Sequence, residues 1–295
     1  MTGMTSQVRY SKKHRRVRRR RWKRLVVLLF ELILLSTVAK AAISAVQLFS
    51  HENRMTDHGF VREFFFPEEA DIIIDMDEDE LDWVIKHIDF FHGLRSERLS
   101  ENAGLTHFLY CYGNGDYESR IPIQIYENEF SGNIPLYLQW DARWGYDAYG
   151  DSVIGLAGCG PSCVAMVVSG LSGDRSITPL TIANYAMNND YYMFGTGTKW
   201  SLILEGIAAF GIEGRQIGIS ESAFLRELHN GNVLVLNVGN GHFTSSGHFI
   251  IICGSFNGKY IVNDPNSIEK SRTLWDYKTI SEEIRAVWSF GRGDL

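Results

Sequence analysis

Three side chains in this sequence could together perform nucleophilic chemistry. Cys159 lies in the run Gly-Cys-Gly-Pro, His248 in Ser-Gly-His-Phe, and Asp264 in Asn-Asp-Pro. A thiolate is the reactive form of cysteine, and an imidazole within reach can stabilise it and later protonate a leaving group. A carboxylate that orients the imidazole completes a nucleophile, base and orienting group. The sequence therefore predicts a cysteine nucleophile, provided that these three positions meet in the fold.

The local sequence around each residue predicts an element that could position it. We expect a helix that begins at Cys159, with Pro161 in its first turn, where the missing N–H costs nothing. The unpaired N–H groups at such a helix start favour a negatively charged sulfur. Residues 248–253 and 259–262 read as strands, and Asn257-Gly258 between them is a strong hairpin signal. Antiparallel pairing can then bring His248 and Asp264, which are 16 residues apart, onto one face.

The rest of this region contains helical and strand patterns in a simple order. Helices come first and strands follow, which is typical of an α+β domain. The expected elements are an extended or strand segment over 136–140, helices over 178–187 with Thr178 as N-cap, 200–210 and 220–231, a strand over 233–238, a helix over 279–285 and a strand over 286–290.

Several sequence blocks together resemble a known family. They are residues 138–145, Tyr149-Gly150, 158–161, 195–201, 246–249 and 262–267. In order and spacing they are similar to the stand-alone relatives of bacteriocin-processing cysteine peptidases, the peptidase C-thirty-nine-like group of the papain-like superfamily. The resemblance spans residues 132–292, and we expect this segment to be the catalytic domain.

The resemblance implies a papain-like fold in which a helix carrying Cys159 packs on an antiparallel sheet carrying His248 and Asp264. It also implies that Gln139 donates a hydrogen bond to the oxyanion. In transporter-linked members the glutamine lies only a few residues before the cysteine, whereas here the separation is 20 residues, as in the stand-alone branch. No ATP-binding cassette follows the domain, so an export-coupled, leader-cleaving role is not expected.

The N-terminal part of the chain reads as a targeting segment. Before Glu31 there are 11 Lys and Arg and no Asp or Glu, and residues 25–49 are mostly apolar. We expect residues 1–24 to be a basic cytoplasmic tail and residues 25–49 a transmembrane signal anchor, because a basic flank stays on the cytoplasmic side. Glu31 and Lys40 interrupt the apolar run. The alternative is a signal peptide cleaved near Ala41, within Ala-Lys-Ala. Either route places the catalytic domain outside the cytoplasm, on the cell membrane or secreted, and neither favours nucleic acid as the partner of the basic run.

Residues 50–131 are expected to form an acidic, partly helical stem. Their carboxylates do not follow the spacing of a calcium loop. The apolar spacing from Glu80 to Phe91 predicts a helix with Gly93 as C-cap, and residues 113–116 read as a turn.

Other residues could compete for these roles. His242 lies in a glycine-rich loop rather than on a strand, so His248 is the preferred base. Cys163 is expected to pack inward, because it lies one helical turn beyond Cys159. Zinc bound by Cys159, Cys163 and a histidine is disfavoured, since no second ligand pair has the spacing of a metal site. A Cys111–Cys253 disulfide and an orienting role for Asn263 stay open, as does the choice between cleft and core for Trp140, Trp144 and Trp200.

The sequence thus predicts a membrane-anchored or secreted thiol hydrolase that cleaves a peptide bond of a peptide or protein substrate, with no cofactor and no metal. Two alternatives remain. The same fold could transfer an acyl group or cleave a cell-wall amide, or the domain could be a non-catalytic module that binds peptides at the cell surface. The sequence specifies neither the substrate nor the oligomeric state.

Overall fold

The computed structural model describes residues 76–91, 99–100, 102–117, 123–125 and 134–291. All of them lie in the second of the two units into which the chain divides, Met1–Phe60 and Val61–Leu295. The anchor predicted for residues 25–49 lies outside the described residues. Within the described ranges, every helix is too short or too polar to cross a bilayer.

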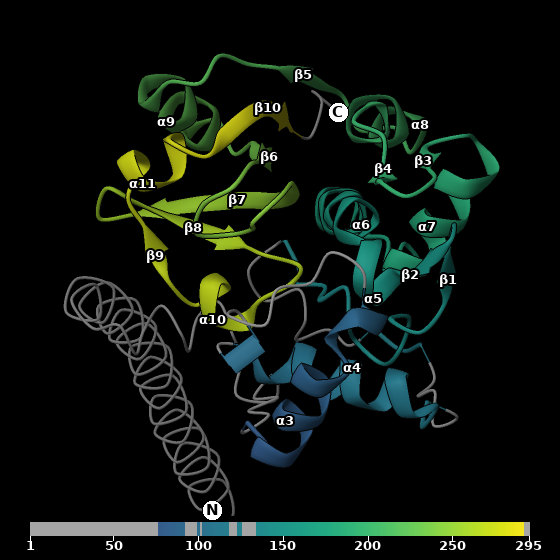
Figure 1. Cartoon of the computed structure of the whole chain (residues 1–295). Helices are drawn as coiled ribbons and strands as arrows, with labels where there is room; N and C mark the ends of the chain where they lie inside the picture. The colour runs from purple at the N-terminus through teal and green to yellow at the C-terminus, as the bar shows by residue number, and fades with distance from the viewer. Residues whose placement is uncertain (1–75, 92–98, 101, 118–122, 126–133, 292–295) are drawn as a thin grey trace, which may run out of the picture. The chain divides into compact units, whose positions relative to one another are not determined.

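An antiparallel sheet of six strands forms one half of the main domain (Figure 1). The strands lie in the order β5 (Gly214–Gln216), β10 (Ile284–Phe290), β6 (Val233–Val238), β7 (His248–Phe256), β8 (Lys259–Asn263) and β9 (Leu274–Trp275). The predicted β7–β8 hairpin is confirmed, and both turn residues, Asn257 and Gly258, have the positive φ that a tight hairpin turn needs.

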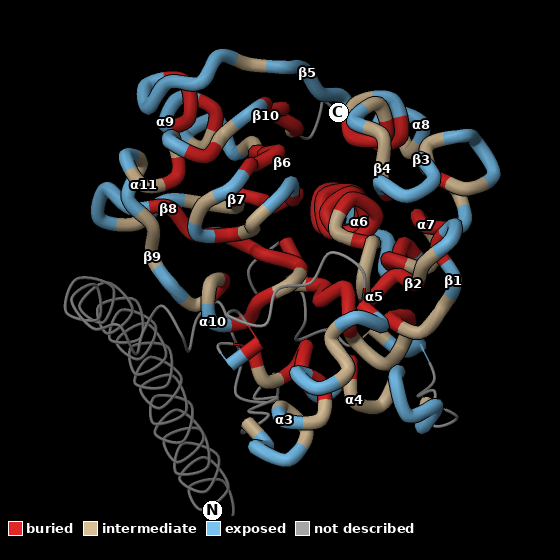
Figure 2. Tube along the Cα trace, viewed as in Figure 1, coloured by how far each residue is buried: buried red, intermediate tan, exposed pale blue. Residues whose placement is uncertain are grey.

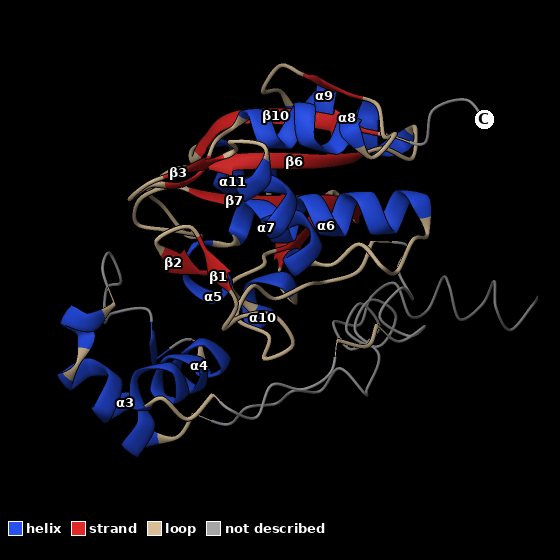
Figure 3. Ribbon diagram, turned by 90° about the vertical axis from the view of Figure 1, so that its right-hand side faces the viewer, coloured by secondary structure: helices blue, strands red, loops and turns tan. Residues whose placement is uncertain are grey.

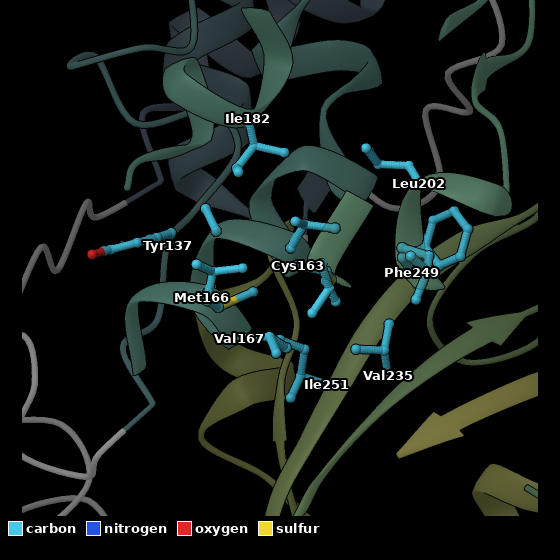
Figure 4. Close-up of a cluster of buried hydrophobic side chains, with 14 of the residues drawn as sticks. Tyr137, Cys163, Met166, Val167, Ile182, Leu202, Val235, Phe249 and Ile251 are labelled. Atoms are coloured by element: carbon cyan, nitrogen blue, oxygen red, sulfur yellow. The ribbon is translucent and has the colours of Figure 1, made fainter. Parts of the chain in front are cut away.

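The helix predicted to begin at Cys159 is confirmed as α6 (Cys159–Ser172), whose residues from Gly160 to Leu171 are all buried (Figure 2). It lies between the sheet and α7 (Pro179–Asn188), whose N-cap is Thr178 as expected (Figure 3). Cys163, Met166 and Val167 of α6 share one apolar cluster with strand residues such as Val235 and Ile251 (Figure 4). Burying α6 on all sides fixes the position of its first residue relative to β7.

The opposite face of the sheet has a second apolar cluster, to which α9 (Glu221–His229) contributes Phe224 and α11 (Tyr277–Ser281) contributes Ile280. The sheet is therefore covered on both faces, which confirms the α+β class. The remaining elements of the domain are β1 (Ala148–Tyr149), β2 (Ser152–Val153), α5 (Ile154–Ala157), β3 (Tyr192–Met193), β4 (Gly197–Thr198), a π-helical turn (Leu202–Gly206), α8 (Ile207–Ala209) and α10 (Ile268–Ser271).

Some predicted boundaries are wrong. The helix expected over 200–210 is an exception, because its bounds agree and only its hydrogen-bond pattern differs: it consists of the π-helical turn followed by the short α8. The last helix ends at Ser281 rather than at Arg285, because β10 begins at Ile284, where it pairs with Val238 of β6. Residues 136–138 join no strand, and Gln139 and Trp140 lie in a turn. The pairing of strands in the folded domain decides where such elements end, and the local sequence period carries no information about that pairing.

Before the main domain lie α3 (Glu78–Lys86), a 3-10 turn (Ile88–Phe90) and α4 (Ala103–Asn114). The helix predicted from Glu80 corresponds to α3, but the proposed C-cap Gly93 is wrong, because α3 ends at Lys86 with His87 as its C-cap. The structure corrects the turn predicted at residues 113–116, because α4 continues to Asn114 and ends at Gly115 in the left-handed conformation. A third apolar cluster joins Phe108 of α4 to Leu138, Trp140 and Ile268 of the main domain.

Candidate active site

Cys159 occupies the first turn of α6, where the flanking glycines are required by close contacts. A Cβ on Gly158 would lie 2.4 Å from the carbonyl oxygen of Ile154, and one on Gly160 would lie 2.6 Å from side-chain atoms of Thr198. Larger residues would therefore push α5 or β4 away from the cysteine. The backbone N–H groups of Gly160 and Phe249 contribute to lowering the pKa of Cys159, and a helix N-terminus favours an anion in the same way.

His248 and Asp264 meet at the ends of β7 and β8. The strand register pairs Ile251 with Asn263, so the residues at these strand ends are brought together. His248 Nε2 lies 2.7 Å from Asp264 Oδ1, and the two residues are 7% and 0% exposed. His248 also interacts with Cys159, because each of these two residues shifts the pKa of the other. Cys159, His248 and Asp264 are therefore neighbours in that order, as a series of three interacting side chains.

The electrostatics of this series favour a thiolate beside an imidazolium. Burial alone would raise the pKa of Cys159, but the hydrogen bond and positive charge of His248 outweigh it, so this pKa lies below its ordinary value. Burial alone would lower the pKa of His248, yet the charge and hydrogen bond of Asp264, followed by those of Cys159, raise it to about 10. The thiolate of Cys159 is therefore formed at a lower pH than that of an ordinary cysteine, and the thiolate is the state that a thiol nucleophile needs.

Asn263 does not take the place of Asp264. Its Nδ2 donates to the carbonyl oxygen of Pro135 at 3.1 Å and lies 4.0 Å from the sulfur of Met166 in α6, so its side chain faces that helix. Asp264 faces His248 instead, and its Oδ1 also accepts a hydrogen bond of 2.8 Å from the backbone N–H of Asn266.

Gln139 bridges the two supports of the site. Its backbone N–H donates to the carbonyl oxygen of Pro265 at 2.7 Å, in the loop after Asp264. Its Nε2 donates to the carbonyl oxygen of Gly155 at 2.8 Å, in α5, which directly precedes α6. Within the described residues its buried Oε1 has no hydrogen-bond partner. The amide nitrogen carries a second N–H, which is the group an oxyanion would need.

Two residues without a predicted role lie beside the cysteine. Tyr149 and Thr198 share a hydrogen bond of 2.8 Å between their hydroxyl oxygens. Burial raises the pKa of Tyr149, and the negative charge of Cys159 raises it further. The hydrogen bond with Thr198 opposes these effects in part. Both residues belong to sequence blocks that carry the family resemblance, and those blocks are the signal that could have identified them. The local sequence around each residue gives no reason to expect a contact between the two.

The competing residues lie elsewhere or are inert. The ring of His242 is 59% exposed and contacts the carboxylate of Glu283 through Nδ1. Cys163 is fully buried, and burial followed by the charges of Cys159 and Asp264 raises its pKa well above the usual range. All four cysteines are free thiols, so the Cys111–Cys253 disulfide is absent. Trp140 and Trp144 are core residues, whereas Trp200 is 47% exposed and contacts the ring of Trp288 edge-on.

Comparison with known proteins places this site in a family. The sequence profile of the Peptidase_C39 like family matches residues 131–290, which include all four predicted site residues. The chain belongs to this family. No protein with a curated description matches it.

Two solved structures are similar to this C39-like chain. One is the peptidase domain of ComA from Streptococcus, a bi-functional ABC transporter involved in a quorum-sensing pathway. It is 19% identical, and the alignment covers 46% of this chain and 91% of that one, with a TM-score of 0.36. The other, from Bacillus anthracis, is assigned as a C39-like peptidase. It is 13% identical, with coverage of 56% and 97% and a TM-score of 0.32.

Proposed function

We propose that the domain is a papain-like cysteine peptidase that hydrolyses a peptide bond with Cys159 as nucleophile, His248 as acid and base, and Asp264 as the orienting group. The observation that carries this proposal is the buried contact of 2.7 Å between His248 Nε2 and Asp264 Oδ1, together with the place of His248 beside Cys159, whose pKa it lowers. Membership of the C39-like family supports it.

The chemistry follows from the ionised pair. The thiolate attacks the substrate carbonyl carbon, and the oxygen that becomes negative accepts a hydrogen bond from the free N–H of Gln139 Nε2. His248 gives its proton to the amine that leaves, so the C–N bond breaks and a thioester remains on Cys159. Water then attacks the thioester while His248 takes its proton, and the acid product leaves with the thiolate restored.

The cysteines provide their own internal comparison for a test. Burial raises the pKa of Cys253 to about 12 and raises the pKa of Cys163 well above its usual range. Burial, followed by the charges of Glu80 and Asp116, also raises the pKa of Cys111. Only Cys159 has a pKa below its ordinary value. At about pH 6, where an ordinary thiol is almost fully protonated, iodoacetamide should therefore label Cys159 selectively, as read by peptide mass spectrometry.

His248→Ala should abolish this selectivity, and Cys159→Ala should remove the labelled peptide altogether. If wild-type Cys159 reacts no faster than a free thiol, the nucleophile is not activated and a peptide-binding module becomes the better description. Digestion of a peptide library, with and without an added amine, then separates hydrolysis from acyl transfer, because transfer leaves a new amide. Wall fragments as substrates test the amidase alternative.

We also propose that residues 25–49 anchor the protein in the cell membrane, with the catalytic domain on the outer side. The support is the charge step between the basic residues 1–24 and the apolar run. The full-length protein should remain in the membrane fraction after alkaline carbonate extraction, and added protease should reach the domain in intact cells. A mature protein that begins near residue 41 would instead indicate a cleaved signal peptide.

A further inference from the structure

The loop that follows Asp264 determines where its carboxylate lies. The backbone N–H of Asn266 donates at 2.8 Å to Asp264 Oδ1, the same oxygen that accepts from His248 Nε2. A displacement of Asn266 would therefore move the acceptor that holds the imidazole.

The carbonyl oxygen of Asn266 is itself held by two side chains. Trp140 Nε1 donates to it at 3.0 Å, and Nδ2 of Asn102 donates to it from outside the segment that matches the family. Asn102 is only 6% exposed and is also the N-cap of α4, because its Oδ1 accepts a hydrogen bond of 3.1 Å from the N–H of Leu105. One amide side chain thus fixes both the start of α4 and the loop after Asp264.

The rest of α4 is seated so closely on the domain that it holds Asn102 in place. A Cβ on Gly104 would lie 2.1 Å from the ring of Trp140, so only glycine permits this approach. One turn further on, the ring of Phe108 covers Gly155, whose carbonyl oxygen accepts from Gln139 Nε2. The helix therefore contacts the supports of both Asp264 and Gln139.

We propose that Asn102 is a positioning residue, which holds the Asp264 carboxylate against His248 through Asn266. This inference rests on the proposed function of the site. It means that a helix outside the family domain takes part in assembling the catalytic groups. Loss of the Asn102 donor should loosen the loop, weaken the contact between Asp264 and His248, and so reduce the stabilisation of the Cys159 thiolate.

The test compares two identical substitutions in α4 of the full-length protein. Asn102→Ser keeps an oxygen that can cap the helix but is too short to reach Asn266. Asn114→Ser, in the last turn of the same helix, loses only the hydrogen bond of 2.9 Å from its Nδ2 to the Tyr110 carbonyl oxygen. The measured quantity is the rate of Cys159 alkylation by iodoacetamide as a function of pH.

For Asn102→Ser the pH of half-maximal alkylation should rise by about half a unit. A shift of this size corresponds to part of the free energy that one hydrogen bond contributes. Asn114→Ser should match the wild type. Equal profiles for the two variants would overturn the inference, whereas absence of accelerated alkylation in the wild type would overturn the proposed function itself. If Asn102→Ser does not fold, Asn102→Asp keeps the size and the cap but turns an acceptor towards Asn266. An unmoved profile for that variant also overturns the inference.

Discussion

At the scale of single residues, the site depends on opposing contributions to two pKa values. Burial disfavours the charged form of both Cys159 and His248. In each residue, the influence of a neighbouring group of opposite charge outweighs the effect of burial. His248 interacts with two such groups, because Asp264 Oδ1 lies 2.7 Å from its Nε2 and the charge of Cys159 also raises its pKa. The two groups titrate as a pair, so the ion pair exists between the lowered pKa of the thiol and the raised pKa of the imidazole.

The substitution Asp264→Asn tests this dependence. The pKa of His248 is raised to about 10 mainly by Asp264, so the neutral amide should lower it and in turn raise the pKa of Cys159. Peptidase activity, which needs the imidazolium as acid, should therefore be lost at a lower pH than the wild-type limit near 10. Cys159 alkylation should begin at a higher pH. The pH profile of activity is measured with a peptide found in the library digest, and the pH profile of alkylation is measured with iodoacetamide. Asn263→Asp, one residue away and facing α6, is the comparison, and identical profiles for Asp264→Asn and wild type would contradict the argument.

At the scale of elements, the structure couples α4 to α5 through one ring. The ring atoms of Phe108 approach Gly155 so closely that an added Cβ would lie 2.2 Å from the nearest of them. We expect Gly155→Ala to lower the free energy of unfolding by about 1–3 kcal/mol, the usual cost of overpacking. The loss should be smaller when Phe108→Leu has already shortened the side chain. Urea unfolding of the wild type, the two single variants and the double variant measures the difference. Gly218→Ala is the reference, because a Cβ there meets nothing within 4 Å. Additive losses would show that the two elements are not coupled there.

The elements that sequence could predict are those whose signals are local. Pro161 and Thr178 mark helix starts, and Asn257-Gly258 marks a hairpin, and each of these features is present in the structure. The α4 helix was not predicted, because aromatic residues and internal glycines obscure its period. Its only clear signals are the cap residues Asn102 and Gly115. The contact of Asn102 with Asn266 spans 164 residues, and no local pattern contains it.

At the scale of the whole molecule, the packed domain is larger than the family match. The match begins at residue 131, yet Trp140, the loop after Asp264 and Gly155 all contact α4 before that point. Removing α4 would expose the apolar cluster that Phe108 and Leu109 share with Leu138 and Trp140. Exposed apolar surface of this kind costs stability in proportion to its area.

A chain that begins at residue 131 should therefore unfold at a lower urea concentration than one that begins at residue 76 and keeps α3 and α4. Trp140, only 5% exposed when α4 is present, should become accessible to acrylamide, so fluorescence quenching should increase in the shorter chain and fall back when Trp140 is replaced by Phe. Cys159 alkylation near neutral pH should slow as well, because the same truncation removes Asn102. Equal unfolding midpoints together with equal alkylation rates would show that residues 131–290 assemble the site by themselves, and that α4 only rests on a finished domain.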